Sequence, residues 1–148
     1  MNWNYLGTEI NELVQVPENM IGFIYLIEFT NGMKYIGKKH LYQTRTLKQL
    51  INKKRDNVIE VKYRNTGKGY RQAYEVVKVE SNWRTYTGSA KECKNLTPRK
   101  KSILQFCKNE YELTYYEVYY QFAYDVLTDA YFINDNILGK FYRNKLKE

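Results

Sequence analysis

Two tyrosines stand ten residues apart on either side of a turn signal: Tyr25 ends the run Gly-Phe-Ile-Tyr, and Tyr35 begins the run Tyr-Ile-Gly. The Asn31-Gly32 pair between them predicts a tight β-hairpin, because both residues tolerate a positive φ. Side chains on neighbouring strands meet in pairs, so the two phenol hydroxyls are expected to converge on one point. The pattern predicts a hairpin that brings the two tyrosines onto neighbouring strands.

Glu117 is the second residue with chemical meaning, because it lies on the apolar side of a predicted helix over residues 110–127. The apolar positions recur at three- and four-residue steps: Leu113, Tyr116, Tyr120, Ala123, Tyr124 and Leu127. A carboxylate in such a stripe is costly unless it has a positive partner or a metal ion. A backbone N–H or a lysine that holds it, or a helix turned slightly outward, explains the position equally well, so these interpretations stay open.

The chain is strongly basic: 24 Lys and Arg against 16 Asp and Glu give a formal net charge of +8 over 148 residues. Residues 46–84 hold ten of the basic side chains and only four acidic ones. A polyanion is therefore the favoured partner, and nucleic acid fits best, although any single lysine is more often just a solvated surface residue. We expect DNA contacts from Lys53, Lys54, Arg55, Lys62, Arg64, Lys68 and Arg71.

Three strands are expected to position the tyrosines. Residues 21–29 are β-branched, aromatic and almost wholly apolar, which indicates a buried strand, and residues 33–37 form its return partner. Residues 101–107 are predicted to add a third strand. Residues 75–80 alternate only weakly and fit either a strand or the end of a helix.

The remaining segments predict a helix, a turn and two less regular ends. Residues 46–55 suit a short basic helix with its leucines and isoleucine turned inward. Residues 65–69 form a turn signal. Residues 1–20 are mixed and polar, and we interpret them as an arm or a short helix that ends before Pro17.

Composition excludes several classes of protein. No apolar run approaches the ~18–20 residues that span a bilayer, and the first residues lack the basic and apolar regions of a signal peptide, so we expect a cytoplasmic protein. The two cysteines, Cys93 and Cys107, make neither a disulfide framework nor a metal pattern. With His40 as the single histidine, a zinc site of standard ligands is not expected.

The hairpin resembles the signature of the GIY-YIG nuclease family, whose two tripeptides sit on adjacent strands at a similar spacing. The first tripeptide reads Phe-Ile-Tyr instead of Gly-Ile-Tyr and keeps the Ile-Tyr pair. A downstream arginine and a glutamate on a later helix follow in the family's order. Trp83, the run Tyr86-Thr87-Gly88-Ser89, Ile103-Leu104 and Tyr115-Tyr116-Glu117 are similar to those of small stand-alone endonucleases of this family found in phages.

The resemblance implies an α+β fold, with a short antiparallel sheet of about three strands flanked by helices and a basic insertion. It implies a nuclease domain over residues 21–137, with the insertion at about 55–80. An N-terminal arm over residues 1–20 and a basic tail over residues 138–148 then lie outside the domain.

The resemblance also gives roles to the two tyrosines and their neighbours. Tyr25 and Tyr35 match the signature tyrosines, one of which positions or deprotonates the attacking water. Because a free phenol titrates at about pH 10, a base role needs cations that lower its pKa. Lys38, Lys39 and Arg45 are the candidates for that effect.

Arg45 also stands where the family has a helix arginine, and its planar fork suits the scissile phosphate. Some members carry an assisting lysine or histidine soon after the second tripeptide, a zone that holds Lys38, Lys39 and His40 here. Gln49 stands where many members have a histidine, so that role passes to His40 as the alternative.

Glu117 matches the family's late-helix glutamate, which binds a single divalent ion, Mg²⁺ or Mn²⁺. One such residue suffices, because Mg²⁺ is commonly held by one or two carboxylates together with water and phosphate. Asn134 matches the last polar residue of the family site, which orients the other groups, and Asn136 is the alternative.

We therefore predict a metal-dependent DNA endonuclease that acts in a bacterial host cell, and the resemblance implies a phage origin. Two alternatives stay open: a non-catalytic nucleic-acid-binding protein on a nuclease-like fold, and a dimeric restriction endonuclease that uses the same chemistry. The target sequence, the oligomeric state and the choice between nicking and double-strand cleavage stay open.

Overall fold

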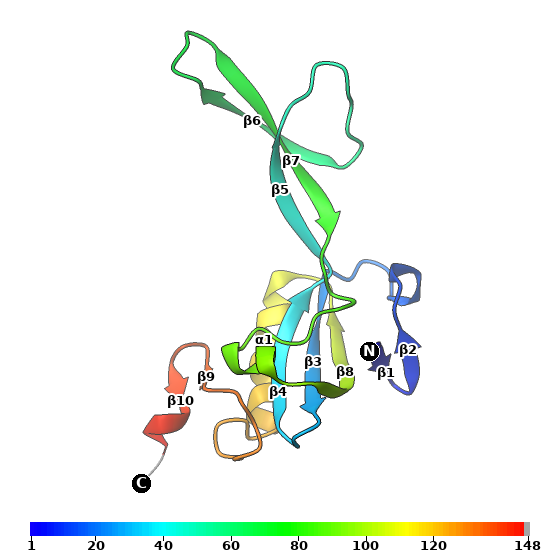
Figure 1. Cartoon of the computed structure of the whole chain (residues 1–148), viewed down its shortest axis with the longest axis vertical. Helices are drawn as coiled ribbons and strands as arrows, with labels where there is room; N and C mark the ends of the chain where they lie inside the picture. The colour runs from blue at the N-terminus through cyan, green and yellow to red at the C-terminus, as the bar shows by residue number, and fades with distance from the viewer. Residues whose placement is uncertain (147–148) are drawn as a thin grey trace. The chain divides into compact units, whose positions relative to one another are not determined.

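The structure, a computed structural model, describes residues 1–146 of the chain. It divides into two compact units, which we call the core unit (Met1–Leu41 and the chain from Asn82 onward) and the inserted unit (Tyr42–Ser81). Each unit is built on its own β-sheet (Figure 1). The insertion therefore starts earlier than the expected residues 55–80. It contains all of residues 46–55, for which we predicted a short basic helix.

The core unit contains a five-stranded sheet in the order β2-β1-β8-β3-β4. In its centre, β3 (Gly22–Phe29) pairs antiparallel with both β4 (Lys34–His40) and β8 (Pro98–Cys107). β1 (Trp3–Tyr5) pairs parallel with β8, and β2 (Thr8–Ile10) pairs antiparallel with β1. The α+β class and the three predicted strands are confirmed, and the sheet has two more strands than expected.

The two additional strands come from the segment that we interpreted as an arm. Trp3 is fully buried, and its indole N–H donates a hydrogen bond of 2.6 Å to the carbonyl of Trp83. Its ring also makes an edge contact with Phe23, with the ring centroids 5.0 Å apart. The buried Trp3 side chain thus anchors a mostly polar segment to the sheet. A 3-10 turn, η1 (Leu13–Gln15), follows β2.

The predicted hairpin between β3 and β4 is confirmed, although of the Asn-Gly pair only Gly32 takes a positive φ. Gly32 adopts a φ of +85°, and its N–H donates to the carbonyl of Phe29. The Asn31 side chain accepts a hydrogen bond of 3.0 Å from the Met33 N–H. This turn fixes the register of the ladder, and the register in turn decides which side chains share a face.

One face of the core sheet is covered by α1 (Glu110–Ala123), whose start is capped by the Asn109 side chain. Ile24, Ile36 and Leu113 are buried where the helix meets the sheet. The helix ends four residues before the predicted residue 127, and the chain then turns so that Val126 and Leu127 still reach the core. In the described residues this is the single α-helix, so the sheet is not flanked by helices on both faces.

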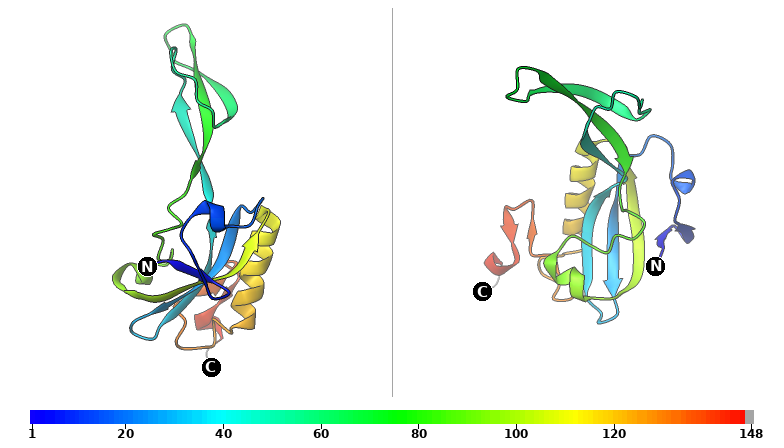
Figure 2. Two further views of the ribbon diagram at one scale, coloured as in Figure 1. Left: turned by 90° about the vertical axis from the view of Figure 1, so that its right-hand side faces the viewer. Right: turned by 45° about the horizontal axis from the view of Figure 1, so that its top comes forward.

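The opposite face of the core sheet is covered by an irregular segment and not by a helix. Trp83 is fully buried there, and it is followed by η2 (Lys91–Asn95), a 3-10 turn. Figure 1 shows the green segment between β7 and β8 passing in front of the sheet. Beyond α1, β9 (Asn136–Ile137) and β10 (Phe141–Tyr142) form a small hairpin, which Figure 2 shows in orange and red. A last turn, η3 (Arg143–Lys145), falls within the predicted basic tail; residues 147 and 148 of that tail lie outside the described residues.

The inserted unit is a three-stranded antiparallel sheet in the order β5-β7-β6. Its strands are β5 (Tyr42–Lys48), β6 (Val58–Asn65) and β7 (Arg71–Glu80). The prediction of a helix over residues 46–55 is wrong. The apolar side chains of this segment do not pack into a core, and Ile51 is fully exposed. Residues 46–48 instead belong to β5, whose backbone pairs with β7.

The turn predicted at residues 65–69 connects β6 to β7, and residues 75–80 belong to a strand, the first of the two alternatives. Among residues 1–146, no helix has the length and apolar character needed to cross a membrane.

Candidate active site around the paired tyrosines

Tyr25 and Tyr35 share one face of the β3–β4 ladder. Tyr25 lies opposite Gly37 and Tyr35 lies opposite Ile27, so the two tyrosines are diagonal neighbours, with ring centroids 6.1 Å apart. Gly37 leaves the room that the Tyr25 ring occupies. A Cβ atom at position 37 would lie only 2.6 Å from Tyr25 Oη. The signature glycine is thus explained by close packing against the first tyrosine.

The two hydroxyls differ in their surroundings. Tyr35 Oη is 2.9 Å from Ser89 Oγ in a hydrogen bond. Tyr25 is fully buried, and its Oη makes no hydrogen bond of good geometry, although Tyr86 and Ser89 lie beside it. The ring of Tyr86 meets that of Tyr25 edge-on at 5.7 Å between centroids. The segment around Tyr86 and Ser89 therefore closes over the tyrosine pair.

Burial sets the ionisation of both tyrosines. It raises the pKa of Tyr25 well above 10.0, and the neighbouring Tyr86 and Tyr35 raise it further. Burial also raises the pKa of Tyr35, against a lowering effect of the hydrogen bond with Ser89. We expected Lys38, Lys39 and Arg45 to lower these pKa values, and that expectation is wrong. Both residues are neutral phenols at physiological pH.

Lys38 and Lys39 point to opposite faces of β4, as neighbouring strand residues must. On the tyrosine face, Lys39 Nζ donates a hydrogen bond of 2.7 Å to Asn82 Oδ1 and lies 4.1 Å from the Tyr86 ring centroid. Burial lowers the pKa of Lys39. On the helix face, Lys38 Nζ is 3.4 Å from Thr114 Oγ1.

The other two predicted catalytic cations lie elsewhere. His40 Nε2 is 2.7 Å from Glu110 Oε1, so the histidine connects the end of β4 to the start of α1. Arg45 is exposed on β5, opposite Val77, and belongs to the inserted unit. It is therefore a strand residue and not the helix arginine that the resemblance implied.

The Glu117 side chain extends from α1 to the outer edge of β4, the last strand of the sheet. Burial raises the pKa of its carboxyl group above 4.5, while the charge of Lys38 and a hydrogen bond from the Lys38 backbone N–H lower it. Both partners that we considered as alternatives to a metal ion, a backbone N–H and a lysine, are thus present. The Glu117 charge also raises the pKa of Tyr35, which places this carboxylate near the tyrosine pair.

The same edge of β4 is held by two amide side chains. Asn134 is buried, accepts a hydrogen bond of 3.1 Å from the Ile36 N–H and donates one of 2.7 Å to the Ile36 carbonyl. Gln121 donates a further hydrogen bond of 3.2 Å to that carbonyl. Asn134 thus contacts the strand between the two signature residues Tyr35 and Gly37, which is the geometry of a positioning residue.

Arg143 fixes the segment that carries Asn134. Its guanidinium group donates to the carbonyl oxygens of Val126, Asp129, Phe132 and Asn134. This member of the predicted basic tail is therefore engaged by backbone and contributes to the architecture of the site.

A polar pocket of about 440 Å³ joins these elements. It is lined by Tyr35, Ser89, Ala90, Glu92, Glu117, Gln121, Ile133, Asn134, Asp135, Asn136 and Leu138. Its donor atoms are mainly carboxylate and amide oxygens, which suit a hard divalent cation better than a zinc ion. Within residues 1–146, no three His, Cys, Asp or Glu side chains gather into a closed metal cage.

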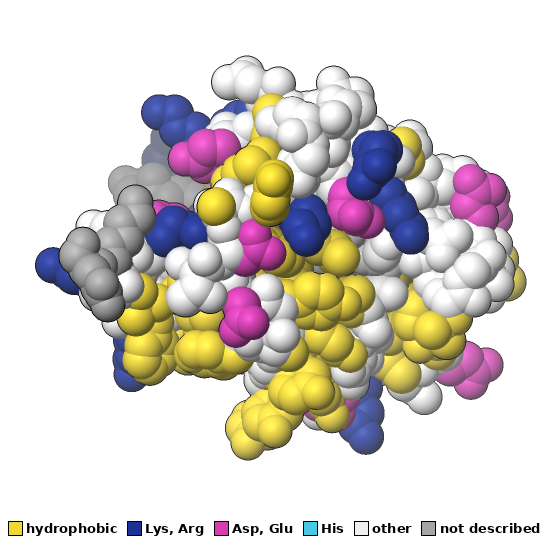
Figure 3. Space-filling model, turned by 90° about the horizontal axis from the view of Figure 1, so that it is seen from below, with side chains coloured by type: hydrophobic (Ala, Val, Ile, Leu, Met, Phe, Trp, Pro, Cys, Tyr) yellow, Lys and Arg dark blue, Asp and Glu magenta, His cyan; other side chains and the backbone are white. Residues whose placement is uncertain are grey.

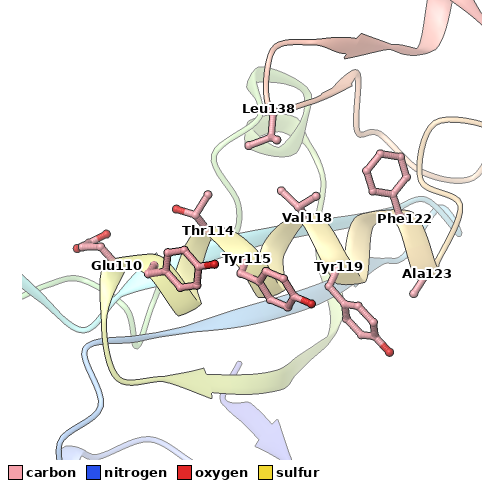
Figure 4. Close-up of a pocket in the computed structure, with 9 residues that line it drawn as sticks. Glu110, Thr114, Tyr115, Val118, Tyr119, Phe122, Ala123 and Leu138 are labelled. Atoms are coloured by element: carbon pink, nitrogen blue, oxygen red, sulfur yellow. The ribbon is translucent and has the colours of Figure 1, made fainter.

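A larger cavity of about 950 Å³ lies along the exposed side of α1, as Figure 4 shows. Val118, Phe122 and Leu138 give it an apolar lining, and Glu110 is the one charged residue among those around it. On the face of the molecule shown in Figure 3, acidic and basic side chains are interspersed with apolar ones. Neither surface has the chemistry of the polar pocket.

The residues predicted to contact DNA all lie in the inserted unit. Six of the seven are exposed: Lys53, Lys54, Lys62, Arg64, Lys68 and Arg71. Arg55 differs, because its guanidinium group donates to Glu75 Oε1 at 2.7 Å and to the Lys48 carbonyl at 3.1 Å. Arg55 therefore forms an ion pair with Glu75 inside the unit and is not free to contact a phosphate.

Sequence reasoning missed two residues that shape the site. Ser89, noted only as part of a resembling run, is the hydrogen-bond partner of Tyr35. Gln121 was not singled out in the sequence, yet it is buried against β4. Its place one turn after Glu117 was the available signal, since residues four apart lie on the same helix face.

Comparison with known proteins gives one match. A protein-family model described as "Putative endonuclease segE, GIY-YIG domain" matches residues 3–142, which includes both units. No curated protein and no solved structure gives a significant match.

Proposed function

The chain belongs to the GIY-YIG nuclease domain family, and from that premise we propose that it is an endonuclease that hydrolyses phosphodiester bonds of DNA with a divalent metal ion. One observation carries the proposal. Tyr35 and the partly buried carboxylate of Glu117 line a single polar pocket, with Tyr25 packed against Tyr35.

The residues present fit a magnesium or manganese ion. Glu117 would hold it, with oxygen atoms of Glu92, Asp135 or Asn136 available in the same pocket. When bound, such an ion supplies positive charge to the phosphate and to the leaving oxygen. It also removes the cost of an ionised carboxylate at a half-buried position.

The tyrosines act in this proposal as neutral hydrogen-bonding groups. Because burial raises both pKa values, neither residue supplies a tyrosinate base near neutral pH. Tyr35, held by Ser89, orients a water molecule through its hydroxyl. The Tyr25 hydroxyl has no hydrogen bond of good geometry and is buried beneath the segment that contains Tyr86 and Ser89, so contact with a substrate or water oxygen would require that segment to move.

Two lysines are proposed to bind phosphate next to this pocket. Lys38 interacts with Glu117 on the helix side of β4, and Lys39 lies over Tyr86 on the tyrosine side. Arg45 stays a proposed phosphate ligand on the resemblance alone. His40 is assigned to the link with Glu110, and Asn134 to positioning of β4.

The experiment incubates the full chain with supercoiled plasmid in Mg²⁺, in Mn²⁺ or in EDTA. We expect conversion to nicked or linear plasmid in either metal ion and none in EDTA. Retardation of the plasmid without any cutting would contradict the nuclease assignment and favour a binding protein on a nuclease fold. Cutting that survives EDTA would contradict the metal assignment.

A further inference from the structure

We propose that one face of the inserted unit binds the phosphate backbone of duplex DNA, through Lys48, Lys62 and Arg64 grouped around Tyr74. We call these four residues the basic face. The inference rests on the proposed function, which makes DNA the substrate, and it specifies which part of the chain holds that substrate.

The register of the inserted sheet places these residues together. Tyr74 on the central strand β7 lies opposite Lys48 of β5 on one side and opposite Lys62 of β6 on the other. Residues opposite each other in a ladder share a face, so all three side chains emerge on the same side. Arg64 lies opposite Gln72, two residues from Tyr74 along β7, and joins the same face. No acidic residue occupies these two rungs.

The aromatic ring holds its cations and is not free for base stacking. The Arg64 guanidinium carbon lies 4.8 Å from the Tyr74 ring centroid. The arrangement repeats farther along the same face, where Lys78 Nζ lies 4.2 Å from the Tyr42 ring centroid. A ring already covered by a cation cannot receive an unpaired base, so this face suits backbone phosphates of a duplex better than a single strand.

The middle of the opposite face of the same sheet is covered. Glu75, which points there, is 7% exposed because Arg55 from the preceding loop pairs with it. The Asn57 side chain also donates to the Lys78 carbonyl, which ties that loop to β7. The loop covers the middle of this face, whereas Lys48, Lys62 and Arg64 on the basic face are all exposed.

Phosphate binding by the three cationic side chains of the basic face can be measured as a salt dependence of DNA affinity. Each phosphate neutralised contributes about 0.9 to the slope of log affinity against log salt concentration. The test measures binding of the full chain to a labelled duplex of mixed sequence, in EDTA so that no cutting occurs, over a series of salt concentrations. The variant is Lys48→Gln/Lys62→Gln/Arg64→Gln, and the control Lys94→Gln/Lys100→Gln/Lys140→Gln removes the same charge from exposed positions of the core unit.

We expect the basic-face variant to lower the slope by about 2 to 3 and the control to change it by less than about 1. Equal losses in both variants, or none in the first, would overturn the proposal. Tighter binding of a single strand than of the duplex would also overturn it. The single variants Lys62→Gln and Arg64→Gln, each expected to lower the slope by about 1, keep the test valid if the triple variant does not fold.

The binding result is separate from the nuclease result. If the plasmid is not cut in Mg²⁺ but duplex binding in EDTA depends on the basic face, the proposed function fails and the surface stands. If the plasmid is cut and the basic-face variant binds like the unchanged protein, the surface fails and the proposed function stands.

Discussion

Gly37 lies opposite Tyr25 in the β3–β4 ladder, and the tyrosine ring fills the space where a larger residue would place its Cβ. The variant Gly37→Ala puts a methyl group 2.6 Å from Tyr25 Oη and 3.0 Å from Tyr35 Cε1. We expect it to lower the free energy of unfolding by about 1–3 kcal/mol, as overpacking does. Urea denaturation of Gly37→Ala, Tyr25→Leu and the double variant measures the coupling. A fully additive cycle would contradict the packing explanation of the signature glycine.

The ionisation of Glu117 has a consequence for stability. Because burial raises its pKa above 4.5, the folded protein binds this proton more tightly than the unfolded chain does. The stability that this residue contributes is present below pH 4.5 and is lost as the pH rises through the raised pKa. Without a metal ion, we therefore expect Glu117→Gln to unfold at a higher temperature than the unchanged protein at pH 7.

Thermal denaturation in EDTA at pH 7 and at pH 4 checks this expectation. The difference in melting temperature should be clear at pH 7 and should nearly vanish at pH 4, where the carboxyl group is protonated in both states. A difference that persists unchanged at pH 4 would show that the variant acts through packing and not through the carboxylate charge.

At the scale of the element, β4 is an edge strand, and several of its outward backbone groups are bonded by other parts of the core unit. Lys34 bonds the segment at Tyr131 and Ile133, Ile36 bonds Asn134, and Lys38 bonds Glu117. Occupied edges do not pair with other chains, which is how proteins commonly protect such strands. The residues proposed for chemistry and for positioning therefore also complete the sheet.

Asn134→Ala tests that dual role. It leaves the Ile36 N–H without its partner and removes the stronger of two bonds to the Ile36 carbonyl. Leaving such buried groups unsatisfied is expected to cost about 2–4 kcal/mol in the free energy of unfolding. Asn136→Ala is the matched control, because the Asn136 side chain accepts only from the Gly139 N–H in an exposed turn. Equal losses in urea denaturation of the two variants would remove Asn134 from its positioning role.

The sequence allowed the hairpin, the third strand and most of α1 to be predicted, because these depend on local signals: an Asn-Gly turn, apolar runs and helical spacing. It failed for residues 46–55, where leucine spacing resembles a helix but long-range pairing with β7 decides the structure. It also failed for Trp3, whose burial depends on a partner eighty residues away. Long-range contacts of this kind leave no periodic signal in a short segment.

For the candidate site, residue identity was more predictable than residue role. Tyr25, Tyr35, Glu117 and Asn134 come together in the core unit as the family order indicated. The state of the tyrosines was not predictable, because it follows from their burial beneath the segment that contains Tyr86 and Ser89. Because cationic residues are near the tyrosines in the sequence, we considered a lowering of the tyrosine pKa values, whereas burial raises them.

At the scale of the whole molecule, charge and chemistry are divided between the two units. The inserted unit contains ten of the 24 basic residues but only four of the 16 acidic ones, whereas the polar pocket belongs to the core unit. The family match runs over residues 3–142, so both units lie within its bounds. This division explains why one segment is proposed for holding DNA and another for cutting it.

The most direct test of this account compares the rate of supercoiled plasmid cutting by the unchanged protein, Glu117→Gln and the control Glu112→Gln in Mg²⁺. Glu112 is on the same helix but interacts with Lys108 and does not line the polar pocket. The account predicts a loss of about 100-fold or more for Glu117→Gln, with duplex binding in EDTA retained, and little change for Glu112→Gln. Cutting by Glu117→Gln at the rate of the unchanged protein would contradict it.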